Sequence, residues 1–123
     1  MPIKAETLEE IAEAIEVLRK SRKLIVVEGK KDKSALNRLG LRNVMTLKKP
    51  LYAVVDEIAA SGEECVLLTD LDREGRKLYS LLRSELQKLG IKIDDRLRNL
   101  LLVKTPLKCI EALADFLEKQ QKQ

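Results

Sequence analysis

Histidine and tryptophan are absent from this 123-residue chain, and only three residues are aromatic: Tyr52, Tyr79 and Phe116. The absence of histidine excludes Ser-His-Asp triads, histidine acid–base catalysis and histidine-ligated metal sites. The scarcity of aromatic side chains argues against a protein that stacks single-stranded bases on aromatic platforms. Any catalysis must therefore depend on carboxylates, on lysines or on a hard metal ion.

Cysteine and long apolar runs are scarce as well. Cys65 and Cys109 lack the CxxC spacing of a zinc site. No apolar run exceeds five residues, which is too short to cross a membrane, and the acidic, polar segment 1–10 does not resemble a secretion signal. We therefore expect a cytoplasmic protein in a reducing environment, with no membrane contact, no disulfide, and both cysteines in the core: Cys65 on a buried strand and Cys109 on the inner half of the last helix.

Hydrophobic residues make up 45% of the chain and charged residues 36%. This composition is enough for one folded domain with its own core and a highly charged surface. Residues 28–49 hold seven basic and two acidic residues, a net charge of +5, whereas the other 101 residues hold 17 basic and 18 acidic ones. The positive excess of the protein thus lies in one segment, which is either a phosphate-binding patch or a solvated surface.

Helical and strand patterns alternate along the chain. The predicted helices cover residues 7–20, 32–39, 50–60 and 74–89, and a last one follows Thr105 and Pro106. The predicted strands cover 23–28, 43–47, 65–69 and 100–103, and residues 91–98 are ambiguous. This alternation predicts an α/β fold with a parallel sheet of about four strands, covered by helices on both sides.

Two local details complete the prediction. Thr7 and Glu10 have the spacing of a capping box at the start of the first helix. In the helix over 74–89, five leucines are expected to face inward: Leu78, Leu81, Leu82, Leu86 and Leu89. Tyr79 of the same helix is expected to pack against its neighbours.

Acidic residues follow two of the predicted strands. Glu28 ends the first strand, and Asp70 and Asp72 end and follow the third. If the strand order is 2-1-3-4, these strands are neighbours, and the three carboxylates meet where ligands bind to such sheets. Carboxylates that converge repel one another unless a cation neutralises them, and oxygen ligands alone select Mg²⁺ or Mn²⁺. The sequence therefore predicts a metal site at Glu28, Asp70 and Asp72.

Basic residues flank these acids on both sides. Gly75 would let the backbone approach closely near a helix N-terminus. The predicted contacts to the phosphates of RNA or DNA are Lys30, Lys31, Lys33, Lys48, Lys49, Arg73 and Arg76.

Each acidic residue also has a purely structural interpretation. A glutamate before a glycine at a strand end is commonly a solvated loop residue. Asp72 could cap the helix that follows it, and Asp32 could be a first-turn acid of its own helix. The hypothesis of a metal site depends on the combination of the acids at two neighbouring strand ends.

The segments from Leu24 to Asp32 and from Leu67 to Gly75 together resemble the Toprim domain family. The family pattern is a strand that ends in Glu-Gly, often with Asp three residues later, and then a strand that ends in Asp-x-Asp with Gly soon after. Topoisomerases, bacterial-type primases, nucleases and a ribosomal RNA maturase share this domain. The resemblance covers roughly residues 22–104, and it implies a Rossmann-like Toprim fold over 22–123, preceded by a separate N-terminal helix over 1–21.

The resemblance also implies roles for individual residues. Glu28 would be the general acid–base or a metal ligand, Asp32 an auxiliary catalytic acid, and Asp70 and Asp72 the ligands of Mg²⁺. No segment of this chain corresponds to the region of a topoisomerase that carries the nucleophilic tyrosine, or to the further domains of a primase. The sequence is therefore similar to small Toprim proteins such as the ribosomal RNA maturase.

Two functions follow from these patterns. One is a Mg²⁺-dependent nuclease or maturation factor that acts on RNA or DNA. The other is a non-catalytic nucleic-acid-binding or assembly module, with a larger protein or ribonucleoprotein complex as a further expected partner. A receiver-like or phosphatase-like domain fits poorly, because both classes place their paired acids at the first strand, whereas here the pair follows the third.

Overall fold

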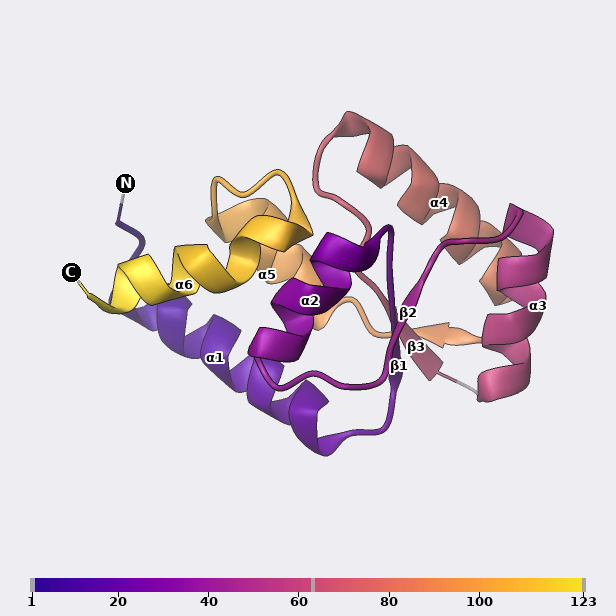
Figure 1. Cartoon of the computed structure of the whole chain (residues 1–123), viewed down its shortest axis with the longest axis horizontal. Helices are drawn as coiled ribbons and strands as arrows, with labels where there is room; N and C mark the ends of the chain where they lie inside the picture. Colours follow the sequence, from indigo (N-terminus) through magenta and orange to yellow (C-terminus); the bar gives the residue numbers. More distant parts are fainter. Residues whose placement is uncertain (1, 63, 123) are drawn as a thin grey trace.

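The computed structural model describes residues 2–62 and 64–122, which form one parallel sheet between two layers of helices (Figure 1). The elements in chain order are α1 (Ala5–Lys20), β1 (Leu24–Val27), α2 (Lys30–Arg38), β2 (Val44–Thr46), α3 (Leu51–Ser61), β3 (Glu64–Leu67), α4 (Arg73–Lys88), β4 (Lys92–Ile93), α5 (Arg96–Lys104), the 3₁₀ turn η1 (Ile110–Ala112) and α6 (Leu113–Gln121). The sheet has four strands in the order β2-β1-β3-β4, and all are parallel. The predicted α/β fold is confirmed, and β1 and β3 are neighbours, as the hypothesis of a metal site assumed.

The two faces of the sheet carry two separate cores, as the alternation of side chains along a strand requires. Ile25 and Val27 of β1 pack with α1, α2, α5 and α6, whereas Val26 packs with α3 and α4. Figure 1 shows the same division, with α3 and α4 on one side of the sheet and the other helices on the opposite side. Since both faces are covered, the strands have to be apolar throughout, which explains the uninterrupted Leu24–Val27 run.

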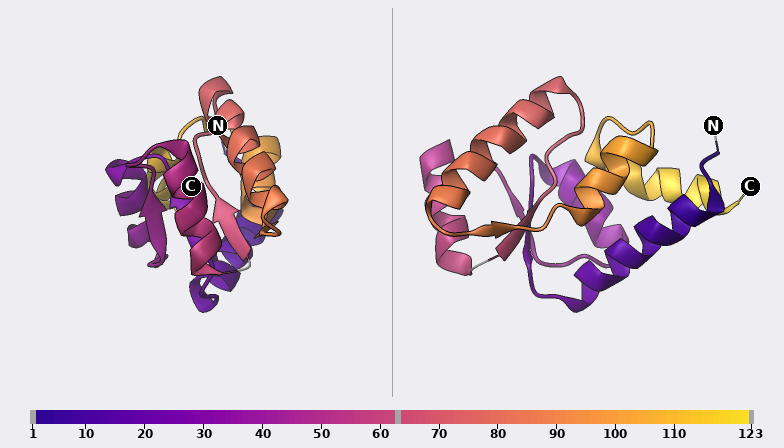
Figure 2. Two further views of the ribbon diagram at one scale, coloured as in Figure 1. Left: turned by 90° about the vertical axis from the view of Figure 1, so that its right-hand side faces the viewer. Right: turned by 180° about the vertical axis from the view of Figure 1, so that it is seen from behind.

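The first and last helices lie side by side, and the two ends of the described chain are close together (Figure 2). The backbone N–H of Ile3 donates to Oε1 of Gln120 at 2.9 Å. Ile11 and Ile15 of α1 and Leu113 and Leu117 of α6 belong to one buried cluster. Within the described residues, no helix has the length and apolar character needed to cross a membrane.

The prediction of a strand over 100–103 is wrong. These residues lie within α5, and the fourth strand is the two-residue β4, inside the segment that was ambiguous. Leu97 and Leu101, four residues apart, are buried on one face of α5, whereas Val103 is 79% exposed. A short apolar run fits a buried strand and one side of a helix equally well, and only the packing distinguishes them.

Three smaller predictions are also corrected. Helix α1 begins at Ala5 after Lys4, so Thr7 is a buried residue of the first turn and caps nothing. Leu81 and Leu89 are about half exposed, because they lie off the inner face of α4. Cys109 precedes η1 and is half-buried, since the last helix starts only at Leu113.

Candidate functional site

The neighbouring strands β1 and β3 bring Glu28 and Asp70 into contact at the carboxyl end of the sheet. Glu28 follows the last residue of β1, and Asp70 lies three residues beyond the end of β3. The Oε2 atom of Glu28 accepts a hydrogen bond of 2.8 Å from the backbone N–H of Asp70. Both residues are half-buried, so their carboxylates are shielded from solvent but not enclosed.

The Asp70 carboxylate has a second partner from a distant part of the chain. Its Oδ1 atom accepts a hydrogen bond of 3.0 Å from the backbone N–H of Ile110, the first residue of η1. The backbone N–H of Leu71 donates to the carbonyl oxygen of Lys108 at 2.8 Å. The segment before α6 therefore lies directly against the loop that carries Asp70 and Asp72.

Asp72 is the N-cap residue of α4. Its Oδ1 atom accepts a hydrogen bond of 2.8 Å from the backbone N–H of Gly75, and its side chain is exposed. A Cβ atom on Gly75 would lie 2.0 Å from the carbonyl oxygen of Asp70, a distance that no side chain allows. The Oγ1 atom of Thr69 also donates to the carbonyl oxygen of Gly75 at 2.7 Å. The loop over 69–75 is thus tightly closed, and the structural interpretation of Asp72 as a cap is confirmed.

Asp32 lies on the first turn of α2, and only 8% of it is exposed. Its Oδ2 atom accepts a hydrogen bond of 3.0 Å from the backbone N–H of Gly29, which closes the start of α2. The backbone N–H of Glu111 lies near enough to lower the pKa of this carboxyl group. Asp32 therefore joins the helix start after β1 to η1, and it is a structural acid as well as a candidate catalytic one.

The four acids act on one another electrostatically. Burial raises the pKa of Glu28 above its ordinary value, and the charges of Asp70, Asp32 and Asp72 raise it further, against the effect of the Asp70 N–H. Burial likewise raises the pKa of Asp32, with contributions from the charges of Asp70 and Glu111, while the N–H groups of Gly29 and Glu111 oppose the rise. The acids therefore share one region of unfavourable negative potential, which a cation would relieve.

The donor set at this site fits Mg²⁺ or Mn²⁺ in its chemistry. The available groups are carboxylate oxygens from Glu28, Asp70 and Asp72, with no imidazole in the chain. Among the described residues, however, no three acidic or cysteine side chains are gathered closely enough to chelate an ion as they stand. Each of these three carboxylates accepts a hydrogen bond from a backbone N–H through one of its two oxygen atoms.

The predicted basic contacts lie on elements that begin at the same end of the sheet. Lys30, Lys31 and Lys33 are exposed on the first turn of α2, and Arg73 and Arg76 are exposed on the first turn of α4. Lys48 follows β2 and is exposed as well. Within the part of the chain that the structure describes, these six cations have no carboxylate partner, whereas Lys49 forms an ion pair with Glu57 at 3.4 Å.

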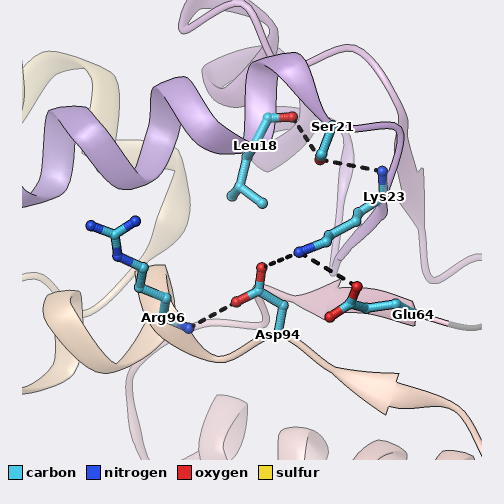
Figure 3. A network of polar contacts seen from close by, with 6 residues as sticks. All are labelled: Leu18, Ser21, Lys23, Glu64, Asp94 and Arg96. Atoms are coloured by element: carbon cyan, nitrogen blue, oxygen red, sulfur yellow. Dashed lines mark hydrogen bonds and ion pairs between the residues drawn. The ribbon is translucent and has the colours of Figure 1, made fainter.

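At the amino end of the sheet, one lysine is paired within the protein (Figure 3). Lys23, just before β1, lies between two carboxylates, with Asp94 at 2.9 Å and Glu64 at 3.5 Å. The backbone N–H of Arg96 also donates to Asp94 at 3.2 Å. The hydrogen bond with Asp94 raises the pKa of Lys23. Lys23 is thus neutralised within the protein, and the cations without partners at the other end remain available to an anionic ligand.

Three residues near the acids were not predicted from the sequence. Lys108 and Glu111 lie on the segment that contacts the 69–75 loop and Asp32, and Arg98 of α5 is buried behind Asp70. Nothing in the local sequence marks them, because they follow Asp70 by 28 to 41 residues and reach it only through the fold. Lys108 and Glu111 are exposed, and they add one positive and one negative charge to the rim of the site.

Tyr79 has a structural environment, as predicted. Its hydroxyl donates to Oδ1 of Asp95 at 2.6 Å and accepts a hydrogen bond from Arg83. Its ring lies over the guanidinium group of Arg98. Burial and the hydrogen bond to Asp95 raise the pKa of Tyr79, so it is held as a neutral phenol and not as an activated nucleophile.

Comparisons with known proteins cover nearly all of these elements. A family model described as the Toprim domain matches residues 23–99. A UPF0292 protein of Methanocaldococcus jannaschii is 34% identical, over 94% of this chain and 95% of that protein. A UPF0292 protein of Pyrococcus abyssi is 37% identical, over 80% of this chain and 77% of that protein.

A solved structure is similar as well. A protein from Aquifex aeolicus superposes with a TM-score of 0.66 at 30% sequence identity, over 87% of this chain and 94% of that one. The residues matched by the family model include Glu28, Asp32, Asp70 and Asp72, but they end before Lys108. The four acids thus lie within the part that the family model matches, and the segment before α6 follows that part.

Proposed function

The chain belongs to the Toprim domain family, and membership of this family indicates in general terms that a protein processes nucleic acid with the help of a metal ion. We propose that this protein is a Mg²⁺-dependent nuclease or maturation factor. Its substrate is a phosphodiester bond of RNA or DNA. The observation that carries the proposal is the contact between Glu28 and Asp70 across the ends of β1 and β3, at the carboxyl end of the sheet.

In this proposal, Glu28, Asp70 and Asp72 hold the metal ion. When bound, Mg²⁺ supplies positive charge that stabilises the negative charge developing on the scissile phosphate. Glu28 also holds or moves the proton at its carboxylate, since a raised pKa brings a carboxyl group nearer to the working pH of a general acid–base. Asp32 is the auxiliary acid, which acts through the electrostatic potential it shares with Asp70.

The exposed cations bind the rest of the nucleic-acid backbone. Lys30, Lys31 and Lys33 line one side of the acids, and Arg73 and Arg76 line the other. We add Lys108 to these predicted contacts, because its carbonyl oxygen is bonded to Leu71 in the loop between the two aspartates. Lys48 would extend the surface toward α3, whereas the ion pair of Lys49 with Glu57 makes Lys49 a weaker contact.

Cleavage assays test this proposal directly. Labelled structured RNA, single-stranded RNA and a DNA duplex are each incubated with the protein in Mg²⁺, in Mn²⁺ and in EDTA. We expect metal-dependent cleavage that falls about 10²- to 10⁴-fold in Glu28→Gln, while binding measured by fluorescence anisotropy is retained. Glu74→Gln is the matched control, because Glu74 lies on the neighbouring turn with its side chain 83% exposed and outside the acid cluster.

A non-catalytic binding module is the second candidate. It is favoured by the observation that no three acidic or cysteine side chains of the described residues are gathered closely enough to chelate an ion. This function predicts tight binding in EDTA, unchanged in Asp70→Asn, and no cleavage of any of the three substrates. Metal-dependent cleavage abolished by Glu28→Gln would exclude it.

A further inference from the structure

Arg98 is a buried cation that the proposed chemistry does not use. It lies on α5, 1% of its surface is exposed, and it is the largest fully buried side chain in the described part of the protein. A charge in the interior destabilises the folded protein unless other groups compensate it. No carboxylate of the described residues forms an ion pair with Arg98, and its Nε atom has no hydrogen-bond partner among them. The buried guanidinium group of Arg98 must therefore stabilise particular groups around it.

The guanidinium group of Arg98 binds the carboxyl end of β3. Its NH1 group donates to the carbonyl oxygen of Thr69 at 2.7 Å and, more weakly, to that of Leu67 at 3.4 Å. Its NH2 group donates to the carbonyl oxygen of Asp70 at 3.1 Å. One planar side chain thus satisfies three backbone acceptors in the segment that leads into the acidic site.

These carbonyl groups need a partner because the sheet ends early on this side. The pairing of β3 with β4 runs only from Glu64 to Cys65, and the last bond on that edge joins the N–H of Asp94 to the carbonyl oxygen of Cys65. On the other edge, β1 continues further, and the N–H of Leu68 donates to the carbonyl oxygen of Val26. Arg98 therefore takes the place of the strand residues that β4 lacks.

Tyr79 of the neighbouring helix α4 holds the guanidinium group in this position. The ring of Tyr79 on α4 lies with its centroid 4.4 Å from the central carbon of Arg98, as in a cation–π contact. The Tyr79 hydroxyl is fixed in turn by Asp95, which also forms an ion pair with Arg83. The stack leaves Arg98 little freedom to leave the carbonyl groups.

We propose that Arg98 is a positioning residue of the acidic site, which holds the peptide between Thr69 and Asp70 so that Asp70 meets Glu28 and Ile110. Three bonds then fix Asp70: its carbonyl oxygen to Arg98, its N–H to Glu28 and its carboxylate to Ile110. Arg98 also places a fixed positive charge within electrostatic reach of Glu28 and Asp70. The importance of Arg98 for catalysis rests on the proposed function, whereas its role in holding Asp70 in place does not.

Amide hydrogen exchange in the metal-free protein tests the positioning role without any assay of activity. Arg98→Lys keeps the charge but cannot donate to three carbonyl oxygens from one planar group. We expect the protection of the Asp70 and Ile110 amides to fall about tenfold more than that of Val26 and Val66 in the strand cores. Leu101→Ala removes a fully buried side chain of the same helix, so it should lower protection by a similar factor at all four amides.

Mn²⁺ affinity, measured by calorimetry on the folded variants, tests the consequence for the site. We expect Arg98→Lys to bind Mn²⁺ about ten- to a hundredfold more weakly than wild type, which is the usual effect of losing a group that orients metal ligands. Arg96→Lys on the exposed side of the same helix should bind as wild type does. If Arg98→Lys does not fold, Tyr79→Leu replaces it, because this variant removes the ring that holds Arg98. Tyr79→Leu should show both the selective loss of amide protection and the weaker Mn²⁺ binding. Tyr79→Phe retains the ring and should show neither effect.

The outcomes separate this inference from the proposed function. A uniform loss of protection in Arg98→Lys, or wild-type protection at Asp70 and Ile110, would overturn the positioning role. Unchanged Mn²⁺ affinity in Arg98→Lys would overturn the inference that Arg98 supports metal binding at the acidic site. If the wild-type protein binds no Mn²⁺, the metal-dependent function fails, and the exchange experiment still decides whether Arg98 positions Asp70.

Discussion

The Glu28 carboxylate accepts a 2.8 Å hydrogen bond from the backbone N–H of Asp70, and this bond joins the end of β1 to the loop after β3. Residues 42 positions apart in the sequence are thereby held in direct contact. The bond favours the charged form of Glu28, but burial and the neighbouring aspartates outweigh it and raise its pKa. The metal-free protein thus retains an electrostatic penalty at this site, which can be measured.

The first prediction concerns the pH dependence of stability in EDTA. The pKa values of Glu28 and Asp32 are raised above 4.5 and 3.8 in the folded protein, so the folded state binds protons more tightly than the unfolded state. Protonation of the two carboxyl groups therefore stabilises the folded protein. This stabilisation is complete below the ordinary pKa values of the unfolded chain, and it is lost as the pH rises through the raised pKa values of the folded protein. Thermal unfolding should show that Glu28→Gln/Asp32→Asn is more stable than wild type at neutral pH, and that the difference disappears near about pH 4. A double variant that is less stable at neutral pH would refute this prediction.

The second prediction separates the two roles of Asp72. Asp72→Ala removes the acceptor for the Gly75 N–H and should lower the free energy of unfolding by about 1 kcal/mol, whereas Asp72→Asn retains a capping oxygen and should cost much less. Urea unfolding measures both. If Asp72 is also a metal ligand, both variants bind Mn²⁺ more weakly than wild type, and wild-type affinity in Asp72→Asn would limit the residue to its capping role.

The third prediction concerns Gly75. In Gly75→Ala, the new Cβ would overlap the carbonyl oxygen of Asp70 at 2.0 Å, and backbone atoms on both sides resist displacement. We expect a loss of several kcal/mol in the free energy of unfolding, or a displaced Asp70 with weaker Mn²⁺ binding. Gly62→Ala is the control, because, apart from its chain neighbours, no described residue has an atom within 4 Å of its added Cβ. Wild-type stability and Mn²⁺ affinity in Gly75→Ala would contradict the tight closure of this loop.

The fourth prediction concerns the salt dependence of nucleic-acid binding. Replacing Lys30, Lys31 and Lys33 by alanine should reduce the slope of log K against log salt by about 2 to 3 for a DNA duplex, since each lost phosphate contact removes about 0.9. Anisotropy titrations over a range of salt concentrations measure the slope. The matched control replaces Lys20, Arg22 and Lys92, which lie at the amino end of the sheet. Equal losses in the two variants would show that binding is non-specific over the whole surface.

Several features could be predicted from the sequence because their causes are local. The apolar runs at Leu24–Val27 and at 65–69 predict buried parallel strands, and the acid after each run lies where such strands end. The strand order then brings Glu28 and Asp70 together, as the structure has it. The capping role of Asp72 was also foreseeable, because an Asp at a helix start is a local signal.

The errors arose where local signals are ambiguous. The residues of α5 include four consecutive apolar ones, which fit a strand until Leu97 and Leu101 are seen to share one buried face. β4 has only two residues and no apolar pattern of its own, so its place in the sheet depends on the strand beside it. The start of α6 likewise depends on contacts of η1 with Asp70 and Asp32, not on Thr105 and Pro106.

The sequence by itself determined the fold class and the acids at the strand ends, because alternation and local propensity act over a few residues. Only the tertiary structure decided which groups surround those acids. Arg98, Lys108 and Ile110 reach Asp70 and its loop through α5 and η1, across 28 to 40 residues of chain. Contacts of this kind follow from the packing of whole elements against one another, and no short-range pattern of residues encodes them.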